Sequence, residues 1–255
     1  MFKISGDPDL VSKWQNLITA FAKRPFKFGD NKEKYSSIDD ILDNLDVEVE
    51  LTKGKEIYRI KKKELDAIEK FWDNVFNSEE IKEFNIQQIL DECNEAEKNN
   101  DEDNNTGEVV SVNLRGCYIP DKNVIKLYPN EMEGEEEYSG MRMEELIVST
   151  LAHETMHAYF NRPGHDSYPS LVIVEEPLAE FGMLLYLKET NCVFYDWAKA
   201  DVEGYKTCYR YGAKLMDLYI GGKKQFRSIL EAYKPGVDFL LQSWMHLFHK
   251  LNVIP

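Results

Sequence analysis

The chain has 255 residues, of which 43% are hydrophobic and 30% charged, a balance typical of globular proteins and not of disordered ones. Its formal net charge of -15 repels phosphate backbones and anionic lipid, so we expect neither nucleic-acid binding nor adhesion to a membrane. No apolar run approaches the roughly 20 residues that span a bilayer, and the start of the chain lacks the apolar segment of a secretory signal. We therefore expect a cytoplasmic protein.

Helices dominate the predictions for the first hundred residues. In residues 9–23, "DLVSKWQNLITAFAK", apolar side chains recur at helical spacing and predict an amphipathic helix. Two more such helices are expected near residues 62–76 and 79–97, and the alternating runs "VEVEL" and "EIYRI" predict a small hairpin over residues 47–60. Nothing in this mainly helical N-terminal region, residues 1–97, carries recognisable chemistry.

An acidic, asparagine-rich segment at residues 98–107 is the predicted linker, because it has nothing to bury. Beyond it, "VVSVNLRGCYIP" and "NVIKLYP" flank "DKN" and predict a hairpin. A helix is expected from about residue 141 to 160, where "NRPG" stops it, and the chain reads as helical again from about residue 175. Early strands followed by helices predict an α+β fold, with a second domain at residues 108–255.

The stretch "LAHETMHAYF", residues 151–160, carries the clearest chemistry. On a helix, His153 and His157 lie four residues apart and project from the same face, so both imidazoles can point at one metal ion. Zinc binds imidazole nitrogen at about 2.0 Å, and a catalytic zinc site uses three protein ligands and a water. Glu154 is rotated about 100° from His153, so it flanks such an ion and is placed as a general base.

The missing third ligand can be sought by spacing among the acidic residues downstream. Glu176, in "VEEPLAEF", follows His157 with 18 residues between them and is the predicted third ligand. Glu180 lies one helical turn further on, where its carboxylate can accept a hydrogen bond from the outer ring N–H of a ligating histidine, and our choice is His153. The pattern predicts one catalytic Zn²⁺ held by two imidazoles and a carboxylate.

With "HETMH" followed by "EEPLAE", the chain resembles the gluzincin branch of zinc metallopeptidases, the thermolysin-like proteins. The resemblance covers roughly residues 108–190. It implies a zincin fold, with a small, mostly antiparallel sheet above the motif helix and further helices toward the C-terminus. It also assigns Glu180 the supporting role at the first histidine. The upstream hairpin resembles the one whose outer strand pairs with the substrate backbone, which implies substrate contacts at Gly116, Cys117 and Tyr118, within an edge from Arg115 to Tyr118.

The chain also departs from known patterns. The familiar asparagine-glutamate pair at the third ligand reads "EE", so Glu175 competes with Glu176 for the metal, although Glu176 is the better spaced. The metzincin pattern fails, because Phe160 stands where its glycine belongs and Pro163 where its third histidine belongs. His165 comes two residues too late for that role.

Hydrolysis of a peptide bond also needs a hydrogen-bond donor for the developing oxyanion. Helical spacing ranks Tyr211 and Tyr209 first as catalytic donors, although most tyrosines in such positions serve packing alone. The other candidates are His165, Tyr168, Tyr205 and Arg210.

These features predict a zinc-dependent peptidase that acts on a peptide or protein substrate. The alternative is a zincin-fold protein used for binding or regulation, with weak or no turnover. Two histidines satisfied by hydrogen bonds in a core would be a third explanation, but Glu176 and Glu180 would then also need partners if buried. His246 and His249 read as core and surface residues of a late helix.

Overall fold

The computed structural model describes residues 1–26, 28–29, 34–54, 57–61, 109–133, 140–161, 172–205 and 209–221. The chain divides into two compact units, and one of them, Met1–Tyr58 with Asn113–Met216, contains the candidate site. The other comprises Arg59–Val112 and Asp217–Pro255. This division differs from the predicted one, because the first 58 residues fold together with residues 113–216. The predicted linker itself, residues 98–107, lies outside the described ranges.

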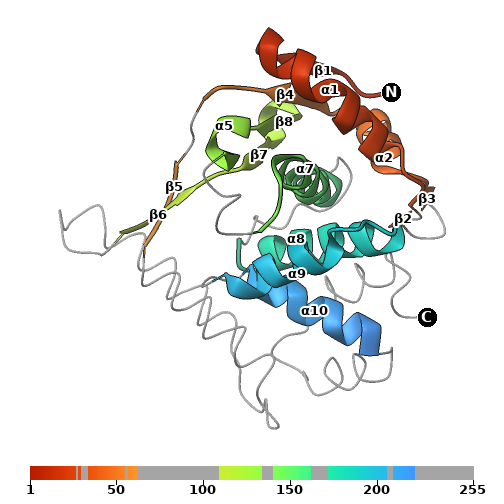
Figure 1. Ribbon diagram of the computed structural model, residues 1–255, viewed down its shortest axis with the longest axis vertical. Coiled ribbons are helices and arrows are strands. Elements are labelled where there is room, and N and C mark those ends of the chain that lie inside the picture. The colour runs from red at the N-terminus through yellow and green to blue at the C-terminus, as the bar shows by residue number, and fades with distance from the viewer. Residues whose placement is uncertain are drawn as a thin grey trace. The chain divides into compact units, whose positions relative to one another are not determined.

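A four-stranded sheet organises the first unit, in the order β1-β4-β8-β7 (Figure 1). Its strands are β1 (Ile4–Gly6), β4 (Glu48–Leu51), β8 (Val124–Leu127) and β7 (Gly116–Ile119). The pairs β1–β4 and β4–β8 are parallel, and only β7–β8 is antiparallel. The expectation of a mostly antiparallel sheet is therefore wrong, because helices cross over between β1 and β4 and so allow parallel pairing.

The hairpin predicted from "VVSVNLRGCYIP" and "NVIKLYP" is confirmed only for residues 116–127, because residues 109–113 form a separate strand with another partner. The hairpin predicted at residues 47–60 is wrong. Between β7 and β8, a short 3-10 turn, η1 (Pro120–Lys122), leads into Asn123, whose positive φ of 53° reverses the chain. Residues 48–51 and 57–61 are both strands, but β4 joins the main sheet and β5 (Ile57–Lys61) pairs with β6 (Val109–Asn113). Alternating patterns identify strands but not their partners.

Two helices follow β1 and help to fill the core. The predicted helix at residues 9–23 is confirmed as α1 (Pro8–Ala22), which begins where Asp7 Oδ1 accepts hydrogen bonds from the amides of Asp9 and Leu10. A two-stranded ribbon, β2 (Phe28–Gly29) with β3 (Lys34–Tyr35), precedes α2 (Ile38–Asn44). The described N-terminal residues thus contain strands as well as helices, and the helices predicted at residues 62–76 and 79–97 fall beyond the described part.

The central helix of the unit is α7 (Met143–Phe160), which confirms the helix predicted over residues 141–160. It lies between the sheet and α8 (Val172–Glu189), and it packs against β7 and β8 on one side and α8 on the other (Figure 1). The short α5 (Pro129–Met132), α1 and α2 also contact it. Apolar residues of α7 are accordingly buried around its circumference, among them Leu146, Ile147, Val148, Leu151, Ala152, Met156 and Tyr159.

Beyond α8 lie α9 (Tyr195–Gly204) and α10 (Arg210–Gly221). The unit is thus a mixture of helices and a small sheet, in agreement with the predicted mixture of α and β elements. Within the described ranges, no helix is both long and apolar enough to cross a membrane.

Candidate metal centre

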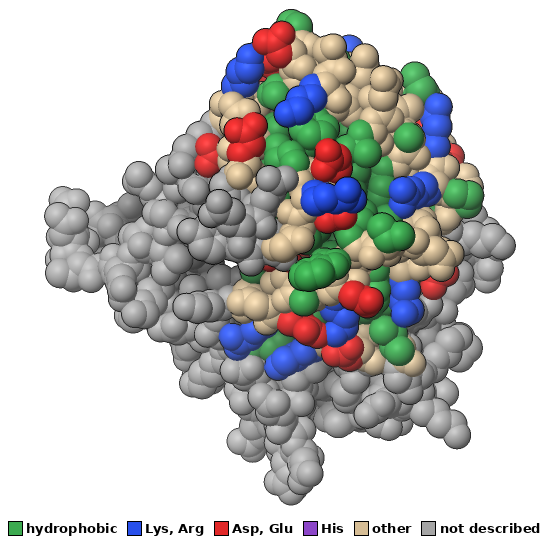
Figure 2. All heavy atoms as spheres, viewed as in Figure 1, with side chains coloured by type: hydrophobic (Ala, Val, Ile, Leu, Met, Phe, Trp, Pro, Cys, Tyr) green, Lys and Arg blue, Asp and Glu red, His purple; other side chains and the backbone are tan. Residues whose placement is uncertain are grey.

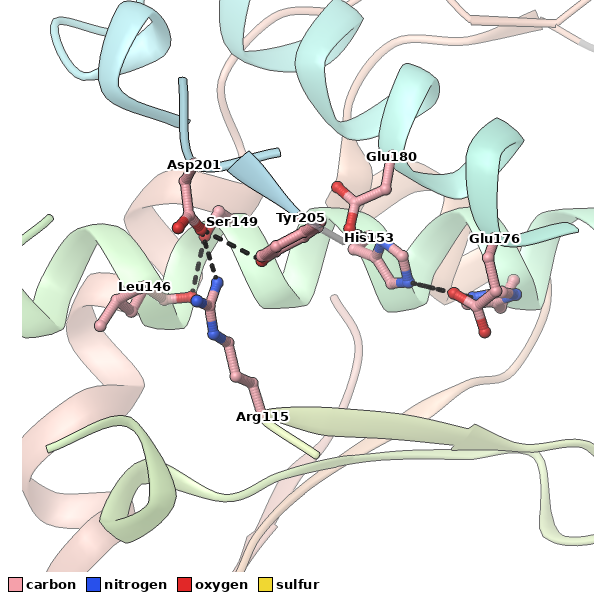
Figure 3. Close-up of polar contacts among 9 residues, drawn as sticks. Arg115, Leu146, Ser149, His153, Glu176, Glu180, Asp201 and Tyr205 are labelled. Atoms are coloured by element: carbon pink, nitrogen blue, oxygen red, sulfur yellow. Dashed lines mark hydrogen bonds and ion pairs between the residues drawn. The ribbon is translucent and has the colours of Figure 1, made fainter. Parts of the chain in front are cut away.

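Two neighbouring helices bring the three predicted ligands together. The four-residue spacing places His153 and His157 on the face of α7 that meets α8. Glu176 reaches toward His153 from α8 (Figure 3). His153 Nε2 and His157 Nε2 lie 3.1 Å apart. Glu176 Oε2 lies 3.2 Å from His153 Nε2 and 3.3 Å from His157 Nε2. The donor atoms therefore form a nearly equilateral triangle.

This triangle has the chemistry of a metal-binding site. At most one proton can lie between two imidazole nitrogens that face each other, and each of them must be unprotonated to bind a metal ion. Glu176 Oε2 is buried and has no hydrogen-bond partner of acceptable geometry in the described structure. A cation at the centre would satisfy all three atoms at once. Among the described residues, His153, His157 and Glu176 are the one group of this kind whose donor atoms all lie within 4.8 Å of one another.

Glu180 lies behind the His153 ring, as the sequence predicted. Its Oε1 is 3.4 Å from His153 Nδ1, on the opposite side of the ring from the triangle (Figure 3). Burial would lower the pKa of His153, but Glu180 and then Glu176 outweigh it and hold that pKa well above its ordinary value. The ring is thus oriented through Nδ1, which leaves Nε2 to face the triangle.

Electrostatic pairing also sets the state of Glu176. Burial would raise the pKa of its carboxyl, but His157 and then His153 outweigh burial and lower it below its ordinary value. Glu176 is therefore ionised at neutral pH, which is the form that binds a cation.

Glu154 follows His153 on α7 and is 6% exposed. Burial raises the pKa of its carboxyl above the ordinary value, against the opposing effect of His153 and His157. The backbone N–H of Tyr118 on β7 donates a hydrogen bond to Glu154, which partly offsets the rise in pKa. A buried carboxylate of raised pKa beside the triangle is suited to accept a proton from a water bound there.

Two glycines allow the helices to approach closely enough to build the site. At Gly182 of α8, a Cβ atom would lie 2.6 Å from both Cγ and Sδ of Met156 on α7. At Gly212 of α10, it would lie 2.3 Å from Glu180 Cβ and 3.0 Å from the backbone nitrogen of Phe181. At Gly212 the atoms met are a Cβ and backbone atoms, so the close approach requires glycine; at Gly182 the buried Met156 side chain would have to shift.

The edge of the sheet runs beside Glu154. In the described sheet β7 is the outer strand, and its residue pairs alternate between hydrogen-bonded and open ones. The amide of Tyr128 donates to the carbonyl of Arg115 at 2.9 Å, so the backbone of Arg115, and by alternation that of Cys117, faces β8. The backbone groups of Gly116 and Tyr118 therefore face outward, where Tyr118 N–H meets Glu154.

Of the two tyrosines predicted as donors, Tyr209 is the one that the structure places beside the three candidate ligands. Its ring stacks on that of His153, with centroids 6.3 Å apart and planes inclined by 29°. Tyr211 is fully buried, and its hydroxyl accepts a hydrogen bond of 3.0 Å from Arg210 Nη2. His165, Tyr168 and the side chain of Glu175 lie outside the part of the chain that the structure describes.

The sequence did not predict the contact of Asp201 with Arg115 and Tyr205. Arg115 Nη1 lies 3.1 Å from Asp201 Oδ2, and the Tyr205 hydroxyl donates to the same oxygen at 3.1 Å (Figure 3). Asp201, on α9, has no motif or spacing that marks it, and it meets Arg115 across 86 positions of sequence. Only the folded chain could reveal this contact.

The three candidate ligands are withdrawn from the surface. The side chains of His153 and His157 are each 12% exposed, and that of Glu176 is 17% exposed. On the face shown in Figure 2, acidic and basic side chains are interspersed over the described residues, and no histidine is visible there.

Comparisons with models of protein families, with curated proteins and with solved structures found no match. The case for a function therefore depends on the chemistry of this site.

Proposed function

We propose that the protein is a zinc-dependent peptidase of gluzincin type, with His153, His157 and Glu176 as the metal ligands. The triangle of donor atoms, with sides of 3.1, 3.2 and 3.3 Å, is the observation that carries the proposal. Tetrahedral zinc with ligands at about 2.0–2.1 Å separates neighbouring donors by roughly 3.3–3.4 Å, close to these sides. Two imidazoles and one carboxylate also suit zinc better than calcium or magnesium, which prefer oxygen ligands.

When bound, zinc supplies Lewis acidity, which makes an attacking water more acidic and polarises a peptide carbonyl. Glu154 accepts the proton of that water and passes it to the nitrogen of the leaving amine. Its burial and raised pKa support this role, because a stronger base accepts the proton more readily. Glu180 holds the His153 ring through Nδ1, and the Tyr209 hydroxyl donates a hydrogen bond to the carbonyl oxygen as negative charge develops there.

The outer edge of β7 is the proposed place for the substrate backbone. An extended peptide laid along this edge pairs with the outward-facing backbone groups of Gly116 and with the carbonyl of Tyr118, whose N–H already donates to Glu154. The backbone of Cys117 faces β8, so Cys117 would contribute to substrate binding only through its side chain. The close approach of Tyr118 to Glu154 supports this arrangement, since it brings the peptide edge beside the proposed base. We include in this proposal the zincin fold and the substrate contacts along β7.

The test combines metal content with digestion of a mixed peptide library. Wild-type protein loaded with zinc is compared with Glu154→Gln, which keeps the shape of the side chain but removes its basic carboxylate. Glu145→Gln serves as the matched control, because Glu145 is also a buried glutamate of α7 but pairs with Arg142. We expect cleavage by the wild type and the control and none by Glu154→Gln, with zinc retained by all three.

Equal cleavage by Glu154→Gln and wild type would contradict the role of Glu154. Bound zinc without cleavage by any of the proteins would reject the peptidase and favour the alternative, a zincin-fold binding protein.

A further inference from the structure

A cluster of three polar residues lies next to the metal centre without belonging to it. Arg115 directly precedes β7, Asp201 is on α9, and Tyr205 follows the last residue of α9. Asp201 Oδ2 accepts hydrogen bonds from the Arg115 guanidinium and from the Tyr205 hydroxyl, each at 3.1 Å. The side chains of Arg115 and Asp201 are only 20% and 14% exposed. Such a partly buried, shared contact fixes geometry better than an exposed ion pair does.

Aromatic rings continue from this cluster to the metal centre. Arg115 lies over the Tyr205 ring, 5.9 Å from its centroid. The Tyr205 ring meets that of Tyr209 edge to face, with centroids 5.7 Å apart, and Tyr209 stacks on His153. A continuous series of contacts therefore joins the start of the edge strand to the ring of a metal ligand.

Tyr205 is unsuited to act on a substrate itself. Its hydroxyl proton is committed to Asp201. Burial raises the pKa of Tyr205 well above its ordinary value, and Glu180 and Asp201 add to the rise against the effect of Arg115. What Tyr205 can do is present a fixed ring edge to Tyr209.

We propose that Arg115, Asp201 and Tyr205 are positioning residues that hold the Tyr209 ring over His153 and so orient the Tyr209 hydroxyl for catalysis. The part of this inference that concerns catalysis rests on the proposed peptidase function, whereas the part that concerns the position of Tyr209 does not. The cluster also ties the end of α9 to the start of β7, so the same contacts hold the substrate edge and the tyrosine in one arrangement.

Nuclear magnetic resonance of the histidine rings tests the positioning directly. The chain has only five histidines, so the ring signals of His153 can be assigned in a protein labelled with ¹³C-histidine. Removing the stacked ring in Tyr209→Leu should shift the His153 signals, because an aromatic ring shields its neighbours. Asp201→Asn and Tyr205→Phe should shift them in the same direction, with and without zinc. Tyr205→Phe keeps the ring and deletes only the hydroxyl, so it carries the test if Asp201→Asn fails to fold.

The matched control is Glu48→Gln, which disrupts the ion pair of 2.9 Å between Lys3 and Glu48 near the edge of the sheet opposite β7. It should leave the His153 signals at their wild-type positions. The proposal is overturned if Tyr209→Leu leaves the His153 signals in place, or if Tyr209→Leu moves them while Asp201→Asn and Tyr205→Phe do not.

Kinetics on the cleaved peptide test the consequence for catalysis. Tyr205→Phe should lower kcat about tenfold, with a smaller change in KM, because a misplaced catalytic group slows the reaction more than it weakens binding. In a Tyr209→Phe background the same substitution should have no further effect, since the cluster acts through the Tyr209 hydroxyl. Additive losses would show that Tyr205 acts otherwise and would overturn the catalytic part. If no peptide is cleaved, the peptidase proposal fails, and the histidine signals still decide the positioning.

Discussion

The proposed support of His153 by Glu180 leads to a quantitative prediction. Glu180→Gln removes the charge that faces Nδ1 but keeps the size of the side chain. Loss of a partner of this kind typically weakens metal binding about 10- to 100-fold, equivalent to about 1.4–2.7 kcal/mol. The separation of 3.4 Å between Oε1 and Nδ1 is long for a charged hydrogen bond and argues for the lower end of that range. The side-chain exposures of 7% for Glu180 and 12% for His153 argue for the upper end, because burial strengthens the interaction.

A competition titration with a chromophoric chelator measures this loss. Because ligand binding stabilises the folded chain, the rise in Tm on adding zinc should also be smaller in Glu180→Gln, by roughly 3–11 °C at saturating metal. Glu145→Gln, which disturbs the pairing with Arg142 at the start of α7, should lower stability without changing zinc affinity. A folded Glu180→Gln protein that binds zinc as tightly as the wild type would refute the supporting role of Glu180.

Three further predictions concern the scaffold. Gly182→Ala should cost about 1–3 kcal/mol of unfolding free energy and weaken zinc binding, since the added methyl group pushes α8 from α7; unchanged urea unfolding would contradict the close approach. Tyr186→Phe should cost about 1–3 kcal/mol, because the buried hydroxyl donates to the carbonyl of Phe21 at 2.6 Å; a neutral effect would show that this carbonyl finds another partner. The pKa of Asp7 is lowered chiefly by Lys53, so Asp7 stabilises the fold above its ordinary pKa of 3.8 and loses that effect as pH falls further. Asp7→Asn should therefore flatten the acid side of the stability curve, and an unchanged curve would count against the pairing.

The convergence of the two histidines was predictable because local geometry determines it. A helix places residues four apart on one face, so His153 and His157 had to converge once the segment was helical. Glu176 required more, namely a second helix packed against the first, and the spacing of 18 residues was informative only through the resemblance to gluzincins. The structure brings all three donor atoms within 3.3 Å of one another.

Strand pairing in the sheet was predictable only where a short turn connects the two paired strands. The hairpin of β7 and β8 turns within a few residues at Asn123, whose side chain also donates to the carbonyls of Leu45 and Asp46. The pairing of β4 with β1 and β8 depends on crossovers and on burial of Val49 and Leu51, which local alternation does not encode. The same limit explains the wrong hairpin at residues 47–60 and the different division into units.

Side-chain contacts across long sequence separations were the least predictable part. Tyr209 and Tyr211 are two residues apart and were ranked together, yet only Tyr209 stacks on His153, while Tyr211 is buried beside Arg210. The contact between Arg115 and Asp201 depends on how α9 meets the start of β7. Such contacts follow from helix packing, for which a single sequence offers no periodic signal.

The most direct test of the central proposal is the zinc stoichiometry of purified protein. The protein is dialysed against a zinc solution, and its metal content is then measured by mass spectrometry. We expect one zinc per chain in the wild type, and little or none in His157→Ala and in Glu176→Ala. Phe2→Leu, a substitution in the N-terminal part of the core, should keep the full equivalent. Wild-type protein that retains no zinc would contradict the proposed zinc site. So would Glu176→Ala protein that retains zinc as tightly as the wild type.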